Sequence, residues 1–452
     1  MTDLTALSAE ALLAGYARGD FTPVDALQAV TERVARRNPD LNAFAVLDPR
    51  SLAAAGESAG RWRAGRPMGA LDGVPCTVKD LVDVAGLPTR RGSRTTSSGA
   101  VVDDAPLVTG LRGAGAVIVG KTTTTEFGWK SPGDCPLHGI TRNPWDTART
   151  TGGSSSGAGA AAAARFGPLH VGTDAGGSVR IPAAWCGVVG LKPSFGLVPQ
   201  WPLGAFAGVA VAGPMTRTVR DAALMLGAMG GWDWRDPMCV PGPRRDWLAG
   251  IEDGVAGLRV GVLRRPGFDA PVDAEGVAAV EQAALVLNAG GAVVEEAVPE
   301  LPDAGALFGQ LWRAALRAVV LGTAPEKRGL LDPGLVALAE AADPPGSVMM
   351  AAAAQQIQAA HAMAALHRQF DVVLCPVVPG PPPLADAPTL DPGGALLRDW
   401  APWTFLFNLT RQPALSVPMG VGAGGLPRSV QVAAAVWRDD LVLRVGRTLE
   451  RS

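Results

Sequence analysis

The chain is poor in the residues that mark secreted or metal-binding proteins. Only five cysteines and four histidines occur among its 452 residues. No two cysteines form a CxxC pair, and an odd, dispersed cysteine count is typical of reduced thiols in a cytoplasmic protein. The histidines lack the spacing of metal ligands, so we expect no metal site. They are His138, His170, His361 and His367.

Long apolar runs and blocks of basic charge are also missing. No stretch of about 18 residues is free of charges, glycine and proline, so we expect no membrane span. The first twenty residues are amphipathic and charged, unlike the apolar core of a signal peptide. The net charge is −2 and there is no basic stripe, which argues against a nucleic-acid partner. We interpret the pairs Arg90–Arg91 and Arg244–Arg245 as solvated surface positions.

The composition and the hydrophobic pattern indicate an α/β protein with a large core. Hydrophobic residues make up 48% of the chain and charged residues 18%. Helical and buried-strand patterns alternate along the sequence. We expect a single large three-layer α/β/α domain around a mixed, mostly twisted β-sheet, formed by residues 1–452. Its predicted elements include helices over 8–18, 22–37 (stopped by Asn38-Pro39) and 274–289, and strands over 116–122, 258–263 and 371–376.

Residues 151–178 are the most informative stretch, with two glycine-serine clusters around an alanine-rich helix candidate. Such a segment fits a place where the backbone approaches a ligand and hydroxyls are presented. In the second cluster, TDAGGS at 173–178, successive backbone N–H groups can converge on one concavity. An acyl-transfer enzyme needs such donors where a carbonyl oxygen becomes negative. A tight turn between a strand and a helix would need the same glycines and remains the alternative.

A serine nucleophile needs a base, and the sequence offers two candidates. His170 is the nearest histidine along the chain, but its apolar surroundings are typical of a packed side chain. Lys79 ends an apolar strand pattern, where burial would disfavour its charged form. Its neighbour Asp80 would favour the charged form, although adjacent strand residues point to opposite faces. A surface lysine at a strand end is the alternative interpretation.

A second pattern, G-x-S-x-G at residues 153–157, would make Ser155 the nucleophile of an α/β-hydrolase. That motif requires a buried strand directly before it, whereas residues 143–150 have the composition of a loop. His361 and His367 fall in a helical pattern and not in a loop after a strand. No Gly-Lys-Ser/Thr follows the glycines, which excludes a phosphate loop.

Three segments resemble the amidase signature family of serine hydrolases. They are GVPCTVKD at 73–80, TGGSSSGAGAA at 151–161 and the long segment 172–199. A weaker similarity covers 408–418 and 425–431, and the resemblance spans nearly the whole chain, with a signature core at about 71–200. Ser156 stands where the family often has glycine. Arg411 replaces another frequent glycine, which puts in doubt any substrate pocket inferred from relatives.

The resemblance implies a Ser–Ser–Lys triad and no cofactor. Carried over by motif, Ser178 is the nucleophile, Ser154 the bridging serine after a cis peptide bond, and Lys79 the base. The implied oxyanion hole consists of backbone N–H groups of Ala175, Gly176, Gly177 and Ser178. The implied supporting residues are Ser155, Asp174 and Arg180.

The implied activity is hydrolysis of C–N bonds in linear amides through an acyl-enzyme. Carbamates (urethanes) and esters share the reacting carbonyl, so the triad does not separate them. Aromatic residues that could line the pocket are Trp129, Trp185, Trp201 and Phe206, although such residues more often belong to a core. The alternative is a glutaminase-type subunit of a tRNA-dependent amidotransferase. We expect a small-molecule amide or carbamate as partner, and a monomer or homodimer.

Overall fold

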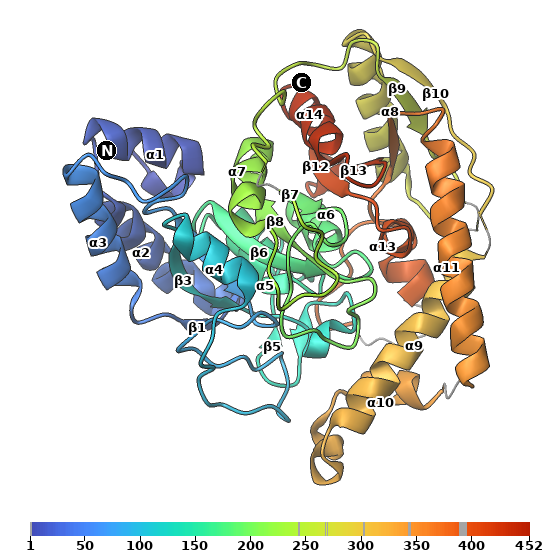
Figure 1. The fold of residues 1–452 in the computed structure, drawn as a ribbon, viewed down its shortest axis with the longest axis horizontal. Coiled ribbons are helices and arrows are strands. Elements are labelled where there is room, and N and C mark those ends of the chain that lie inside the picture. Colours follow the sequence, from blue (N-terminus) through green and yellow to red (C-terminus); the bar gives the residue numbers. More distant parts are fainter. Residues whose placement is uncertain are drawn as a thin grey trace.

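One mixed sheet of eleven strands organises the computed structural model (Figure 1). The structure describes residues 2–242, 245–266, 268, 270–301, 303–341, 345–387 and 396–452, so Arg244 lies outside it, whereas Arg245 is exposed as predicted. The strand order is β1-β3-β2-β6-β8-β7-β12-β13-β11-β9-β10. The strands are β1 (Phe44–Leu47), β2 (Pro75–Lys79), β3 (Val117–Thr122), β6 (Leu169–Asp174), β7 (Val189–Lys192), β8 (Val211–Thr216), β9 (Arg259–Val262), β10 (Val293–Glu296), β11 (Val372–Pro376), β12 (Ala414–Val421) and β13 (Pro427–Ala434). A separate hairpin pairs β4 (Asp134–Cys135) with β5 (Gly139–Ile140).

Helices cover the sheet and confirm the α/β prediction. They are α1 (Ala9–Arg18), α2 (Pro23–Leu41), α3 (Ser51–Arg63), α4 (Pro106–Gly113), α5 (Ser156–Ala163), α6 (Arg180–Cys186), α7 (Val219–Met229), α8 (Ala274–Ala289), α9 (Ala304–Gly322), α10 (Pro333–Glu340), α11 (Gly346–Leu366), α13 (Phe405–Leu409) and α14 (Asp439–Glu450). In Figure 1, α1 to α3 lie at one side of the molecule and α9 to α11 at the other. No helix among the described residues combines the length and the apolar character needed to cross a bilayer.

The sheet separates two apolar clusters, and the alternation of strand residues decides which side chain joins which. In β11, Val372 and Leu374 pack in the cluster that contains α4, α7, α8 and α14. Val373 and Cys375 pack on the other face, with α9 and α13. β2 runs parallel to both β3 and β6, and β6 pairs antiparallel with β8. The carboxyl ends of β2 and β6 therefore lie side by side, which is where the glycine-serine segments meet.

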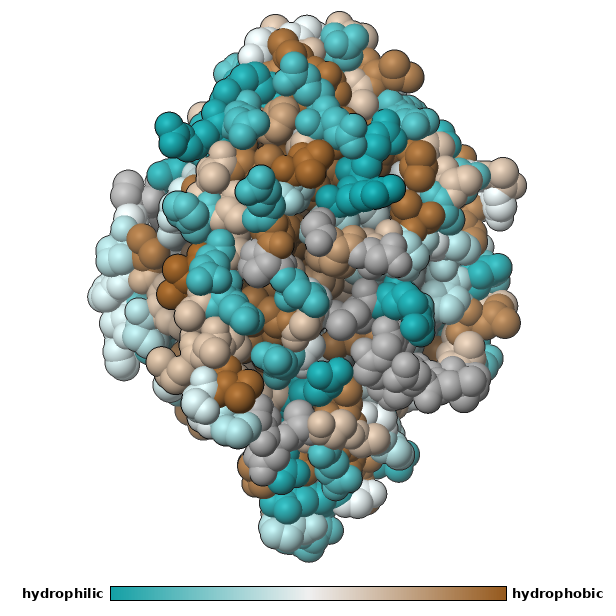
Figure 2. Space-filling view, turned by 90° about the vertical axis from the view of Figure 1, so that its right-hand side faces the viewer, coloured by the Kyte–Doolittle hydropathy of each residue, from teal (hydrophilic) through white to brown (hydrophobic). Residues whose placement is uncertain are grey.

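The face of the molecule at the right of Figure 1 shows no comparable division into hydrophobic and hydrophilic areas. On the face seen at the right of Figure 1, hydrophilic side chains are interspersed with separate hydrophobic ones (Figure 2). All five cysteines are buried and unpaired.

The prediction that Asn38-Pro39 stops the second helix is wrong, because α2 continues through Pro39 to Leu41. Pro39 lies in the last turn, where its missing N–H removes a single hydrogen bond. Asn42 ends the helix in the left-handed conformation, and its N–H donates to the Asn38 carbonyl at 2.7 Å. The Asn38 side chain accepts from Ala43 N–H, also at 2.7 Å. These two asparagines satisfy the helix end that the proline was expected to break.

Candidate active site

Lys79, the last residue of β2, is fully buried. Cys76 and Val78 point into the apolar cluster on one face of the sheet, and Lys79 lies on the opposite face. The carboxylate of Asp80 lies 2.8 Å from Nζ of Lys121, and both of these side chains are buried. The interpretation of Lys79 as a surface lysine is therefore wrong, and the opposite-face prediction for Asp80 is confirmed.

The Lys79 amine contacts hydroxyl groups and a backbone carbonyl. Its Nζ lies 2.8 Å from Ser154 Oγ, 2.9 Å from Ser155 Oγ and 2.9 Å from Thr173 Oγ1. Burial lowers the pKa of Lys79 well below its ordinary value, while the negative charge of Asp174 opposes that shift in part. Because no carboxylate pairs with this amine among the described residues, its environment favours the neutral form.

The first glycine-serine segment supplies the two serines beside this amine. The Gly153–Ser154 peptide bond is cis. Ser155 Oγ accepts from Thr173 N–H at 3.2 Å and donates to the Thr173 carbonyl at 3.1 Å. Ser155 N–H donates to the carbonyl of Ser178 at 3.1 Å. These bonds tie the start of α5 to the end of β6 and to the segment that carries Ser178.

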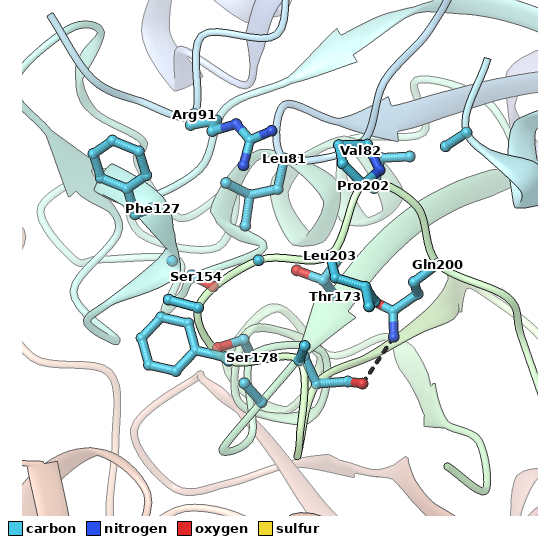
Figure 3. A pocket seen from close by; sticks show the side chains of 18 of the residues that line it. Leu81, Val82, Arg91, Phe127, Ser154, Thr173, Ser178, Gln200, Pro202 and Leu203 are labelled. Atoms are coloured by element: carbon cyan, nitrogen blue, oxygen red, sulfur yellow. Dashed lines mark hydrogen bonds between the residues drawn. The ribbon is translucent and has the colours of Figure 1, made fainter. Parts of the chain in front are cut away.

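Ser178 and Ser154 line the same pocket, together with Thr173 (Figure 3). No hydrogen bond joins the Ser178 hydroxyl to Ser154 within the described chain. Gly177 N–H donates to Asp174 Oδ1 at 2.7 Å. In contrast, no described protein group accepts a hydrogen bond from the N–H of Ala175, Gly176 or Ser178. The backbone before the Ser178 side chain thus presents unused donors.

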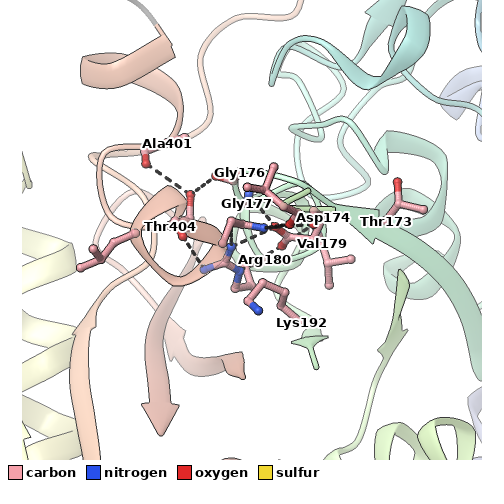
Figure 4. Close-up of polar contacts among 12 residues, drawn as sticks. Thr173, Asp174, Gly176, Gly177, Val179, Arg180, Lys192, Ala401 and Thr404 are labelled. Carbon is pink, nitrogen blue, oxygen red and sulfur yellow. Dashed lines mark hydrogen bonds and ion pairs between the residues drawn. The ribbon is translucent and has the colours of Figure 1, made fainter. Parts of the chain in front are cut away.

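Asp174 and Arg180 form a buried bidentate ion pair behind this turn (Figure 4). Arg180 donates from Nε to Asp174 Oδ2 at 3.0 Å and from Nη2 to Oδ1 at 2.9 Å. Its remaining donors reach the Thr404 carbonyl, Asn408 Oδ1 and Gln431 Oε1. Burial raises the pKa of Asp174, but the charge and hydrogen bonds of Arg180 outweigh it and hold that pKa well below its usual range. The ion pair therefore stays charged and anchors the turn.

Of the four aromatic residues predicted for the pocket, Trp201 and Phe206 line it. Trp129 and Trp185 do not. Trp185 is buried on α6 with its indole N–H donated to the Gly380 carbonyl at 2.9 Å. Trp129 packs edge-on against Trp400 in the interior. Both rings belong to the core.

The sequence alone missed several pocket residues, among them Arg91, Phe127 and Thr173. Thr173 directly precedes the DAGGS motif, so proximity in sequence could have indicated it. For Arg91 the interpretation as a solvated surface position is wrong, because its side chain is partly buried and lines the pocket. Its place depends on the turn that follows β2, which no local pattern indicates.

The histidines lie apart from these groups. His170 is fully buried, with Nδ1 2.8 Å from Thr77 Oγ1, and burial lowers its pKa to about 3. His361 lies in α11 and His367 caps it, as predicted. Residues 143–150 contain no strand, so the structural context required for a nucleophile at Ser155 is missing. In the described ranges, no three His, Cys, Asp or Glu side chains gather in a way that could hold a metal ion.

Comparison with known proteins identifies the family of the chain. The family model described as Amidase matches residues 25–443. The acylamidase of Rhodococcus erythropolis is 36% identical over 461 residues, which cover 98% of this chain and 95% of that protein. A Glutamyl-tRNA(Gln) amidotransferase subunit from Salinispora arenicola is 34% identical over 492 residues, covering 100% and 98%.

A solved structure has the same fold. A bacterial aryl acylamidase of the amidase signature enzymes superposes with a TM-score of 0.89 at 27% identity, covering 98% of this chain and 96% of that one. The chain therefore belongs to the amidase signature family.

Proposed function

We propose that the chain is an amidase that hydrolyses C–N bonds in linear amides through an acyl-enzyme on Ser178. One amidase domain over residues 1–452 would carry the reaction. The observation that carries the proposal is the buried Lys79 amine, surrounded by hydroxyls and lacking an acidic partner among the described residues. A neutral amine in that place can accept a proton, whereas a paired lysine could not.

In the proposed mechanism, Ser178 Oγ attacks the substrate carbonyl while its proton passes to Ser154 and the Ser154 proton passes to Lys79 Nζ. The negative oxygen of the tetrahedral intermediate would be held by the N–H groups of Ala175, Gly176 and Ser178. Since Gly177 N–H is already donated to Asp174, its part is to shape the turn. Ser154 then gives a proton to the leaving amine, the C–N bond breaks, and water attacks the acyl-enzyme by the reverse relay.

This relay requires a hydrogen bond between Ser154 and Ser178 that the described structure does not contain. Catalytic hydrogen bonds are often long before substrate binds and shorten in the complex. Ser155 and Asp174 with Arg180 would act as positioning residues, because their contacts hold the two serine segments together.

A covalent trap tests the nucleophile. We expect a fluorophosphonate or an aryl ester to label the peptide that carries Ser178, and Ser178→Ala to lose both labelling and turnover. Labelling of Ser155 would instead support the G-x-S-x-G interpretation. Turnover that persists in Ser178→Ala would overturn the proposal.

The pocket walls favour amides with an apolar or aromatic arm. Leu81, Phe127, Trp201, Leu203 and Phe206 line the space beside Ser178. Aryl carbamates have the same carbonyl and a similar arm, so we include carbamate hydrolysis in the proposed range. Anilides and carbamates of the same aryl amine should then both release that amine, and absence of carbamate turnover at enzyme concentrations that cleave the anilide would exclude it.

The similarity to amidotransferase subunits favours glutamine hydrolysis as a second candidate. Free glutamine carries an ammonium group that calls for a carboxylate in the pocket. None of the described lining residues is acidic, which weighs against this candidate. A glutaminase assay on the purified chain, combined with size-exclusion chromatography, separates the two and also tests the monomer or homodimer prediction.

A further inference from the structure

Arg91 is the only charged residue among the described residues that line the pocket beside Ser178. In Figure 3 its guanidinium extends from the wall near Leu81 and Phe127 toward the interior of the pocket. The remaining lining residues are apolar or carry neutral polar groups. A single cation in such surroundings gives the pocket a positive potential that nothing on its described walls cancels.

No ion pair or hydrogen bond joins the Arg91 guanidinium to another described residue. Two acidic residues lie close to its backbone, and both are already engaged. Glu126 accepts hydrogen bonds from the Ser93 hydroxyl and from Asp332 N–H. Asp80, whose carbonyl accepts from Arg91 N–H, pairs elsewhere. Its Oδ1 lies 2.8 Å from Lys121 Nζ, and both of its oxygens accept the N–H of Arg90 at 3.2 Å. The five donors of the guanidinium are therefore free to bind a group that enters the pocket.

The backbone holds Arg91 in place more firmly than an ordinary loop would. Its φ is 53°, in the left-handed region, and Gly92 follows at 64°. Its N–H donates to the Asp80 carbonyl at 3.0 Å, and its carbonyl accepts from Phe127 N–H at 2.8 Å. A left-handed conformation of a non-glycine residue persists only where surrounding contacts fix it. The backbone of Arg91 is thus fixed by the residue that follows β2 and by the 3-10 turn Glu126–Gly128 that follows β3.

We propose that Arg91 binds an anionic group of the substrate, so that the enzyme prefers amides that carry a carboxylate. A carboxylate matches the planar fork of a guanidinium and forms charge-assisted hydrogen bonds with it. This inference rests on the proposed hydrolysis at Ser178 and names the substrate class of that same pocket. The carboxylate can sit on the acyl arm or on the amine arm, and the experiment includes both.

The test compares substrates matched in size that differ in charge. For the acyl arm, glutaryl para-nitroanilide is compared with the para-nitroanilide of a branched, uncharged acyl group of equal size. For the amine arm, para-acetamidobenzoate is compared with para-isopropylacetanilide. We expect kcat/KM to favour the anionic member of at least one pair by about tenfold or more at low salt. The preference should shrink as ionic strength rises.

Three variants assign that preference to Arg91. Arg91→Gln should lower kcat/KM of the anionic member about tenfold more than kcat/KM of the uncharged member, and Arg91→Lys should keep part of the preference. Both substitutions of Arg91 keep a non-glycine residue at the left-handed position, so the backbone strain of these variants matches that of the wild type. Arg90→Gln is the control, because Arg90 neighbours Arg91 but is not among the lining residues, and we expect it to leave the preference unchanged.

Direct binding makes the outcome independent of turnover. In Ser178→Ala, calorimetry should find glutaryl para-nitroanilide or para-acetamidobenzoate bound about tenfold more tightly than its uncharged partner, and Arg91→Gln should abolish the difference. Equal binding in both pairs, or an equal loss for charged and uncharged ligands in Arg91→Gln, would overturn the inference. Hydrolysis of uncharged anilides without any anionic preference would leave the proposed function standing. Arg91-dependent binding of the anionic ligands without hydrolysis would support the inference about Arg91 and contradict the proposed function.

Discussion

Asp80 follows Lys79 directly in the chain, yet its carboxylate lies 2.8 Å from Nζ of Lys121 on the neighbouring strand. The two buried lysines at the ends of β2 and β3 therefore have different partners. Lys121 is paired with an acid, whereas Lys79 contacts hydroxyls and a carbonyl. The alternation of side chains along β2 is what keeps the Lys79 amine without a partner acid.

The first prediction concerns the pH dependence of turnover. Burial lowers the pKa of Lys79 well below that of a free lysine, and the proposed base is its neutral form. Activity should be full above that pKa and should fall as the pH drops through it. Lys79→Arg stays protonated throughout and should lose about 10²–10⁴ in kcat/KM. The measurement is kcat/KM for an anilide from acid to alkaline pH, and an unchanged profile in Lys79→Arg would contradict the assignment.

The same lysine should lower stability. In the unfolded chain Lys79 has a pKa of about 10.4, so at neutral pH the unfolded state binds a proton that the folded state disfavours. The free energy of unfolding of the wild type should then rise with pH between the folded and unfolded pKa values. Lys79→Met removes this penalty and should have a higher Tm than the wild type at neutral pH, with the gap narrowing toward pH of about 10. A lower Tm at neutral pH would show that the lysine stabilises the fold.

Only part of the candidate site could be predicted from the local sequence. The glycines before Ser178 and the apolar strand pattern before Lys79 indicated these two residues. The places of Ser154 and Ser155 followed only from the resemblance to the amidase signature family, and Thr173, which also contacts Lys79, was missed. The sheet order was not predictable in this way. The neighbours of a strand depend on how distant helices pack, as the position of β11 between β13 and β9 illustrates.

The third prediction concerns the ion pair behind the nucleophile segment. Arg180→Met leaves Asp174 charged and buried without its partner, so the free energy of unfolding should fall by about 3–5 kcal/mol. The control is Arg438→Met, which breaks an equally bidentate pair with Asp440 whose side chains are 49% and 45% exposed. That loss should be about 0–1 kcal/mol. Urea denaturation measures both, and equal losses would contradict the anchoring role of Arg180.

The pocket was harder to predict than the strand-end residues, for a physical reason. Aromatic side chains fill cores as well as pockets, so composition did not separate Trp201 and Phe206 from Trp129 and Trp185. The distinction arises from tertiary packing. Phe206 packs against Trp312 of α9 with 4.2 Å between ring centroids and an interplanar angle of 34°, so a helix far along the chain contributes to the position of this pocket ring.

The fourth prediction concerns Trp201, one of the aromatic residues that line the pocket. Trp201→Ala should raise KM for aryl amides by about threefold to tenfold, the loss expected for one aromatic contact of about 0.5–1.5 kcal/mol. Small aliphatic amides should show a smaller change because they do not reach the ring. Trp232→Ala is the matched control, since Trp232 is similarly exposed but does not line this pocket. Equal effects of the two substitutions on KM would show that Trp201 does not contact the substrate.

The last prediction concerns the backbone of the nucleophile turn. Gly177 has φ of 133°, and a Cβ there would collide with Thr404 Oγ1. Thr404 cannot move away freely, because its hydroxyl donates to the Gly176 carbonyl at 2.6 Å and its carbonyl accepts from Arg180. Gly177→Ala must therefore displace the turn, together with the N–H groups proposed to bind the oxyanion.

Loss of one such donor costs about 10²–10³ in kcat in other acyl-transfer enzymes, and we expect a fall of at least that size. Gly204→Ala is the control, because Gly204 lines the same pocket and a Cβ there meets no atom within 4 Å. It should leave kcat nearly unchanged. Burst kinetics of Gly177→Ala with an aryl ester then distinguish a folded protein with a displaced turn from a misfolded protein. A folded Gly177→Ala protein should acylate slowly yet retain substrate binding, whereas normal acylation would show that the turn tolerates a side chain and that its exact path does not set the rate.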